Sequence, residues 1–221
     1  DTATAVAKGP LTVARYGIVA TGNDDFGYFA GGVPAYSTVD RVDYSSDTST
    51  AVEKGPLSGA RRRMGGTGNQ NFGYFGGGNP GPLSIVDRID YSNDTATASP
   101  KGPLSAARYS LAATGNTDFG YFGGGHPSGA TYASTVDRVD YSNDTATALV
   151  KGPLSLARSQ FAATGDANFG YFAGGVPSPV ISTVDRIDYS NDTATAVVKG
   201  PLSEKRYAGA AASAGANALP Q

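Results

Sequence analysis

A seven-residue pattern of aromatic and small residues, Phe-Gly-Tyr-Phe-(Ala or Gly)-Gly-Gly, returns four times, beginning at Phe26, Phe72, Phe119 and Phe169. Neighbouring side chains of a β-strand point to opposite faces, so the adjacent aromatic residues Tyr28 and Phe29 need cover on both sides. Glycine leaves a strand through a tight turn or a positive φ at the least steric cost. The pattern therefore predicts a doubly covered strand that ends in a glycine turn.

Three further segments complete the unit in which this pattern lies. In the first copy, small apolar residues predict a strand at 15–21, which a Thr-Gly-Asn turn closes. Residues 37–44 alternate with a period of two and predict a third strand, with Arg41 on one face and Asp40 on the other. A fourth strand is expected at 48–53, after a Ser-Ser-Asp or Ser-Asn-Asp turn in which Asn and Asp bond their own backbone. A Lys-Gly-Pro-Leu linker then leads to the next unit.

The copies repeat with a period of 46 to 50 residues, measured between the aspartates Asp1, Asp47, Asp94, Asp144 and Asp192. This period is typical of β-propellers, whereas leucine-rich, ankyrin and tetratricopeptide repeats are shorter. We therefore predict an all-β fold, a propeller of four complete four-stranded blades with extra terminal strands, in a single domain over 1–221. Its repeats are 1–46, 47–93, 94–143 and 144–191, with a partial repeat at 192–221. A section of a larger ring is the alternative.

The composition and the charge of the chain exclude several kinds of site and partner. The 31 glycines, 13 tyrosines and 9 phenylalanines suit short aromatic strands and tight turns, and the absence of cysteine excludes disulfides and cysteine-based sites. A net charge of −2 offers no attraction for nucleic acid. No apolar run approaches the ~18 residues that span a bilayer. We expect neither nucleic acid nor a membrane as partner.

Taken together, the parts of one unit resemble the kelch repeat. They are the aromatic strand ending in Gly-Gly at 28–32, the Val-acid-Arg strand at 39–43, and Pro56, Leu57 and Arg61 at fixed spacing. The proline, leucine and arginine return at 103–108 and 153–158. The resemblance covers nearly the whole chain and implies a kelch-like β-propeller.

One position departs from the kelch pattern. The tryptophan usual in the family's fourth strand is replaced by Thr or Ala, as around Thr97 and Ala98. If the resemblance holds, the packing between blades rests on Tyr and Phe instead.

A second resemblance concerns the biological setting of the protein. The twelve residues 87–98 are repeated without change at 185–196, and such near-identical copies are similar to repeats in large structural proteins of marine cyanophages. This resemblance implies a phage structural protein of the tail or an appendage, located in the virion or on an extracellular surface.

Charged residues recur in phase with the repeat. Each unit has counterparts of Asp40, Arg41 and Asp43, together with a linker arginine such as Arg15. A catalytic site needs one constellation rather than four, so we interpret these residues as structural ion pairs near the packed interfaces. The Asn and Asp cluster at 23–25 could suggest calcium, but its copy at 69–71 has no carboxylate, and turn chemistry explains both. We expect no metal and no cofactor.

The sequence shows no recognisable catalytic set. His126 is the only histidine, and the other residues with acid or base groups outside the repeat pattern, Glu53, Glu204 and Lys205, are scattered along the chain. The copper ligands of kelch-like galactose oxidase are also missing. We expect no catalytic residues and a non-enzymatic protein. A glycan-active enzyme on a propeller scaffold, and an engineered or excised fragment without its own function, remain alternatives.

The candidate binding residues lie in the loops between second and third strands, which differ among the copies in length and chemistry. Apolar and aromatic residues beside prolines on scaffolded loops are common recognition elements, and we expect a protein or glycan partner there. Loop drift without function is the open alternative. The candidate residues are Val33, Pro34, Tyr36, Asn79, Pro80, Leu83, His126, Pro127, Tyr132, Val176, Pro177, Val180 and Ile181.

Overall fold

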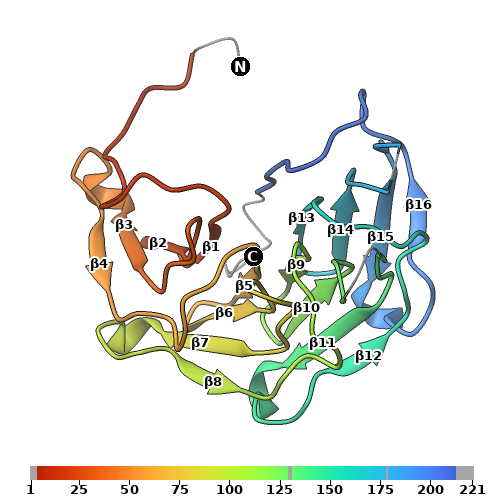
Figure 1. Cartoon of the computed structure of the whole chain (residues 1–221), viewed down its shortest axis with the longest axis horizontal. Coiled ribbons are helices and arrows are strands. Elements are labelled where there is room, and N and C mark those ends of the chain that lie inside the picture. The colour runs from red at the N-terminus through yellow and green to blue at the C-terminus, as the bar shows by residue number, and fades with distance from the viewer. Residues whose placement is uncertain (1–3, 129–130, 178, 213–221) are drawn as a thin grey trace.

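The chain forms four antiparallel sheets of four strands each in the computed structural model, which describes residues 4–128, 131–177 and 179–212 (Figure 1). Blade 1 contains β1 (Val19–Gly22), β2 (Phe26–Ala30), β3 (Val39–Asp43) and β4 (Val52–Lys54). Blade 2 contains β5 (Gly65–Gly68), β6 (Phe72–Gly76), β7 (Val86–Asp90) and β8 (Ser99–Lys101). Blade 3 contains β9 (Ala112–Gly115), β10 (Phe119–Gly123), β11 (Val136–Asp140) and β12 (Leu149–Lys151). Blade 4 contains β13 (Ala162–Gly165), β14 (Phe169–Ala173), β15 (Val184–Asp188) and β16 (Val197–Lys199).

The strands of each blade are hydrogen-bonded in sequence order, which confirms the predicted all-β fold with four complete blades. A single 3-10 turn joins the third strand to the fourth in every blade: η1 (Tyr44–Ser46), η2 (Tyr91–Asn93), η3 (Tyr141–Asn143) and η4 (Tyr189–Asn191). Within the described residues, no helix has the length and apolar character needed to cross a membrane.

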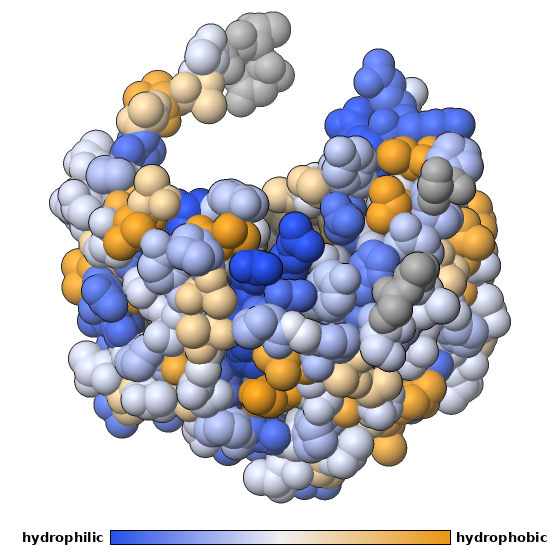
Figure 2. All heavy atoms as spheres, viewed as in Figure 1, coloured by the Kyte–Doolittle hydropathy of each residue, from blue (hydrophilic) through white to orange (hydrophobic). Residues whose placement is uncertain are grey.

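The blades lie along an arc with their first strands at the centre (Figure 1). Strand β1 packs beside β5, β5 beside β9, and β9 beside β13. An opening separates blade 1 from blade 4, and the space-filling view shows the same opening (Figure 2). In this structure the arc is therefore open, and each end blade has one face that no neighbouring blade covers.

In the two inner blades, the second strand packs against the blades on both sides. In β6, Tyr74 and Phe75 are both fully buried, as their adjacent positions predict. Tyr74 stacks on Tyr141 of blade 3, while Phe75 belongs to the apolar cluster that includes Tyr28 of blade 1. The second-strand tyrosine thus faces the following blade, and the phenylalanine faces the preceding one, wherever that neighbour is present.

The glycine pair after each second strand has the predicted backbone conformation. Gly31 and Gly32 have φ values of 68° and 126°, a region that favours glycine. The N–H of Gly32 donates to the carbonyl of Arg61 at 3.1 Å, and a Cβ on Gly31 would collide with that same oxygen. Both the turn and the close approach of the next blade's linker therefore require glycine.

The terminal segments occupy repeat positions without forming strands among the described residues, although extra terminal strands were expected. At the N-terminus, the N–H of Gly9 donates to the carbonyl of Asp47 at 2.7 Å, as Gly55 does to Asp94 at 2.8 Å. Near the C-terminus, the N–H of Leu202 donates to the carbonyl of Ser182 at 2.8 Å. Residues 4–15 thus act as the linker into blade 1, and residues 200–206 take the place of a linker into a following blade. The residues after 212 lie outside the described part.

Truncation of a second-strand phenylalanine will test this packing. We expect Phe75→Ala to lower the free energy of unfolding by about 3–5 kcal/mol, because it removes a fully buried ring. Phe29→Ala is the matched control, since Phe29 has the same repeat position but lies half-exposed where no blade precedes it. Denaturant unfolding should show a clearly smaller loss for the control, and equal losses would contradict the assigned packing.

Candidate functional site

The loops that carry the candidate residues all lie on one face of the blades, together with the linkers. In every blade, the residue after the glycine pair forms an antiparallel bridge with a residue of the linker. These pairs are Tyr16 with Val33, Arg62 with Asn79, Tyr109 with His126, and Ser159 with Val176. We call this surface the loop face; it consists of these four pairs and the rest of the described loop residues 33–36, 79–83, 126–128, 131–132, 176–177 and 179–181.

A chain of backbone hydrogen bonds holds neighbouring linkers together just beyond these bridges. Arg63 donates its N–H to the carbonyl of Gly17 at 3.1 Å, Ser110 to that of Arg63 at 2.7 Å, and Gln160 to that of Ser110 at 2.9 Å. All four residues have a positive φ, between 54° and 66°. The sequence did not point to these positions, because only Gly17 is a glycine. These hydrogen bonds join each linker to the next one, and they therefore fix the positions of the bridge pairs of neighbouring blades relative to one another.

Blade 3 carries an aromatic cluster on the loop face. The His126 ring stacks on Tyr109 with centroids 5.1 Å apart, and Tyr132 lies 4.6 Å from His126 at an angle of 49°. The Nδ1 atom of His126 is 3.1 Å from the carbonyl oxygen of Thr131. All three rings are half-buried, so each presents part of its surface to solvent. The structure thus brings the candidates His126 and Tyr132 together and adds Tyr109, which sequence reasoning missed because it lies in the linker.

The remaining candidates divide between the bases and the tips of the loops. The backbone carbonyls of Tyr36, Leu83 and Ile181 accept the N–H groups of Arg61, Arg108 and Arg206, at 2.9, 2.9 and 3.3 Å. These three residues therefore anchor the returning arms of the loops in blades 1, 2 and 4. The tips differ in exposure: Pro34 and Pro80 are exposed, while Pro127, Pro177 and Val180 are half-buried.

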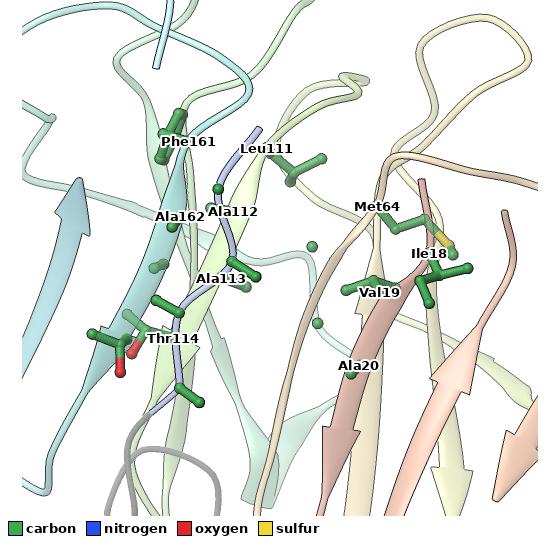
Figure 3. Close-up of a pocket in the computed structure, with 18 of the residues that line it drawn as sticks. Ile18, Val19, Ala20, Met64, Leu111, Ala112, Ala113, Thr114, Phe161 and Ala162 are labelled. Carbon is green, nitrogen blue, oxygen red and sulfur yellow. The ribbon is translucent and has the colours of Figure 1, made fainter. Parts of the chain in front are cut away.

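The first strands of the blades surround an open hollow of about 370 Å³ (Figure 3). Figure 3 shows Ile18 and Val19 of blade 1 on one side of it and Ala112 and Ala162 of blades 3 and 4 on the other. Its lining consists of apolar residues, glycines and threonines. This lining can make apolar contacts and hydroxyl hydrogen bonds, and none of its residues has an acidic or basic side chain.

The linker arginines form buried ion pairs inside the blades, as predicted. Each pairs with the first aspartate of the third strand: Arg15 with Asp40 at 2.9 Å, Arg61 with Asp87 at 2.6 Å, Arg108 with Asp137 at 2.8 Å, and Arg158 with Asp185 at 3.0 Å. Burial lowers the pKa of Arg108, and the Asp137 carboxylate acts in the opposite direction. Each pair fixes a linker to the sheet that follows it.

The third-strand arginines act between blades, on the aspartate that follows each 3-10 turn. Asp144 of blade 3 accepts from the Tyr74 hydroxyl at 2.9 Å and pairs with Arg88 at 2.8 Å and Lys101 at 3.4 Å, all from blade 2. We call this arrangement the aspartate grip. It recurs at Asp94, held by Tyr28, Arg41 and Lys54, and at Asp192, held by Tyr121, Arg138 and Lys151.

The aspartate grip corrects one expectation from the sequence. We expected the aspartate of the Ser-Asn-Asp turn to bond its own backbone, but Asp144 binds the neighbouring blade instead. The turn is held by the last residue of the third strand, since the Asp140 carboxylate accepts from the N–H and hydroxyl of Ser142 at 2.9 and 2.6 Å. These hydrogen bonds lower the pKa of Asp140.

The Asn and Asp cluster between first and second strands has the predicted turn chemistry. The side-chain oxygen of Asn23 accepts from the N–H groups of Asp25 and Phe26 at 3.0 and 2.9 Å. Asn69, Asn116 and Asp166 make the same pair of bonds. Within residues 4–128, 131–177 and 179–212, no group of three or more His, Asp or Glu side chains is placed to hold a metal ion.

Comparison with known proteins supports the fold. The chain is similar to the solved structure of YjhT, a β-propeller, with a TM-score of 0.74 and 11% sequence identity over 90% of this chain and 69% of YjhT. At this identity the likeness shows a propeller fold alone. No protein-family model matches the sequence. A search of curated proteins also gives no match.

The aspartate grip can be tested with two substitutions at equivalent positions. We expect Asp144→Ala to lower the free energy of unfolding by about 3–5 kcal/mol, because it leaves Arg88 and Lys101 without their partner at a buried position. Asp47→Ala is the matched control: Asp47 pairs only with Lys8 among the described residues, and 41% of its side chain is exposed. We expect the control to cost less than ~1 kcal/mol. Chemical denaturation measures both, and equal losses would contradict the stabilising role of the grip.

The buried tyrosines predict a loss of stability at high pH. Burial, with the hydrogen bond to Asp144, raises the pKa of Tyr74 above its ordinary value of 10.0, and Tyr121 behaves alike beside Asp192. The folded state then holds these protons more tightly than the unfolded state. Their contribution to stability is therefore full below pH 10 and falls as the pH rises above it. In a titration above pH 10, circular dichroism reports unfolding and absorbance reports tyrosine ionisation. We expect the buried tyrosines to ionise only as the protein unfolds. Ionisation of all the tyrosines in a protein that is still folded would contradict the prediction.

Proposed function

We propose that this protein is a non-enzymatic binding module, in which the four-bladed scaffold presents the loop face to a protein or glycan partner. One observation carries the proposal: the variation among copies is concentrated on the loop face. The opposite face carries the Asn23-type turns and the 3-10 turns, whose side chains hold the turn or the aspartate grip in every complete interface. The scaffold is thus constant while the loop face differs from blade to blade.

The aromatic cluster of blade 3 is the part of the loop face best suited to binding. Tyr109, His126 and Tyr132 combine ring faces with polar atoms, and aromatic residues with few rotatable bonds are common at the centre of recognition surfaces. Stacking and the bridge between Tyr109 and His126 hold the rings in place before a ligand arrives. A rigid aromatic surface of this kind suits the apolar face of a sugar ring or an aromatic side chain of a protein.

The setting we propose is a phage virion appendage or an extracellular surface. Support comes from the similarity of the near-identical copies at 87–98 and 185–196 to repeats of cyanophage structural proteins. In such a setting, a repeated scaffold with variable loops would recognise a host glycan or another virion subunit. Neither nucleic acid nor a membrane is part of this proposal.

A glycan array and intact cyanobacterial cells will test the proposal. We expect the combined variant Tyr109→Ala, His126→Ala and Tyr132→Ala to lose binding by about tenfold or more, with a melting temperature close to that of the parent. The control is Asn71→Ala, which changes an exposed side chain in a turn on the opposite face and should retain binding.

A second variant covers the rest of the loop face. Replacing each of the other three loops with the blade 1 sequence Val-Pro-Ala-Tyr removes the differences among the loops. If binding to glycans or cells survives this change in a folded protein, the loop face is not the binding surface. Absence of binding by the parent protein to any glycan, cell or purified virion subunit would also overturn the proposal.

A further inference from the structure

The three interfaces between consecutive blades share one set of contacts, and this set defines what an uncovered blade face can bind. A second-strand tyrosine stacks on the tyrosine that opens the next blade's 3-10 turn, with centroids 4.5 to 4.7 Å apart. A first-strand threonine shares a hydrogen bond of 3.1 to 3.2 Å with that same tyrosine. The aspartate grip completes each interface. Because the same contacts occur at all three interfaces, they show which residues a blade face needs in order to bind another blade.

Blade 4 has the donor half of this interface without an acceptor. Among the described residues, Arg186 and Lys199 have no ion-pair partner, and the buried Thr164 hydroxyl has no hydrogen-bond partner. Tyr171 is half-buried, whereas Tyr28, Tyr74 and Tyr121 at the same position are fully buried. The Arg186 guanidinium lies 4.2 Å from the ring centroid of Phe169, as the third-strand arginines of the other blades lie on theirs. It is therefore already held as in the other blades.

Blade 1 has the acceptor half with a single donor among the described residues, Lys8, which lies 3.1 Å from Asp47 and has the repeat position of the grip lysines; the tyrosine and the arginine of a preceding blade are missing. The side chain of Asp47 is 41% exposed, while that of Asp144 at the same repeat position is 7% exposed. Tyr44 is 52% exposed, compared with 9% for Tyr141 and Tyr189. The exposed carboxylate and tyrosine of blade 1 thus match in kind the unpaired cations, tyrosine and threonine of blade 4.

We propose that the uncovered face of blade 4 binds the uncovered face of blade 1 of a second copy of this chain, head to tail. In this pairing Tyr171, Arg186 and Lys199 of one copy grip Asp47 of the other. Tyr44 of the second copy stacks on Tyr171 and shares a hydrogen bond with Thr164. The charges are complementary, and the geometry is the one that the chain already uses three times.

The partner is a second copy rather than the chain's own blade 1. The opening between blades 1 and 4 separates the two faces within one molecule (Figures 1 and 2). Closing it would require all three existing interfaces to rotate, with their stacked tyrosines and buried ion pairs. A contact between copies leaves these interfaces unchanged. Because the two surfaces differ, the contact is heterologous and forms a closed ring or a filament, according to its rotation.

The linker segments near the two ends of the chain have similar sequences, so either of them can occupy the linker position at a junction between two copies. Residues 8–15 read Lys-Gly-Pro-Leu-Thr-Val-Ala-Arg, and residues 199–206 read Lys-Gly-Pro-Leu-Ser-Glu-Lys-Arg. A junction has room for one linker, so residues 199–206 of the first copy replace residues 8–15 of the second. Arg206 then takes the place of Arg15 against Asp40, and Gly200 takes that of Gly9 against the carbonyl of Asp47. The C-terminal linker keeps its bonds to blade 4 from Leu202 and Arg206. Residues 209–212, which line the hollow beside Ala162 and Thr164, move aside for β1 of the second copy.

Sedimentation of the full chain over a concentration series tests this contact. We expect the fraction of protein in species of two or more copies to increase with protein concentration. Added salt should lower this fraction, because the grip is ionic. Asp47→Arg and Arg186→Asp should each remain a single copy, since each places like charges at the junction. Mixing the two variants should restore assembly, because every junction between unlike copies then has opposite charges. Asp24→Arg, at an exposed aspartate in a blade 1 turn away from the junction, is the control and should assemble like the parent.

Several outcomes would overturn the proposal. One is a parent protein that stays a single copy at all concentrations, which includes closure of the four blades within one molecule. Another is an Asp47→Arg variant that assembles as the parent does. A mixture of folded Asp47→Arg and Arg186→Asp that stays unassembled would also overturn it, and circular dichroism confirms that each variant is folded. These measurements do not depend on the proposed ligand of the loop face.

Discussion

The structure depends on one contact, the grip of a buried aspartate by the tyrosine, arginine and lysine of the preceding blade. Asp94, Asp144 and Asp192 each lie between two sheets that have no backbone hydrogen bonds to each other's strands. Burying a carboxylate is unfavourable unless it is paired and hydrogen-bonded, so only the arrangement that brings all three partners to it is stable. The grip therefore specifies the register of neighbouring blades, while stacked tyrosines and buried phenylalanines fill the same interfaces with large apolar side chains.

A repeated contact of this kind makes the end blades different from the middle ones. Phe29 in blade 1 and Tyr171 in blade 4 are half-exposed at positions that are buried elsewhere, because each lacks one neighbour. In a repeat array, stability comes from the units and from the contacts between neighbours, so the ends are the least stabilised parts. The same asymmetry leaves donors at one end and an acceptor at the other, which is the basis of the head-to-tail contact.

The constant interfaces also explain where variation is tolerated. Turn residues on the face opposite the loops have defined hydrogen bonds, as Asn23 and Asp140 do, and their replacement would disturb a strand connection. The loops after the glycine pairs are held at their bases by bridges to the linkers, so their tips can change without affecting the sheets. Binding by the loop face and assembly through the end blades would then use separate surfaces of one scaffold.

The sequence by itself determined the period, the four strands of each complete unit, the glycine turns and the interpretation of the recurring arginines and aspartates as structural ion pairs. These features depend on neighbours within a unit, and four copies make each local pattern visible. The tertiary structure alone decided which blade each charge contacts, because the sequence does not show that Asp144 reaches Arg88, 56 residues away. It also decided the meeting of Tyr109 with His126, the positive φ of Arg63, Ser110 and Gln160, and the open arc. Contacts between blades, or between a linker and the loop of its own blade, set these features, and the local sequence pattern does not specify which segments meet.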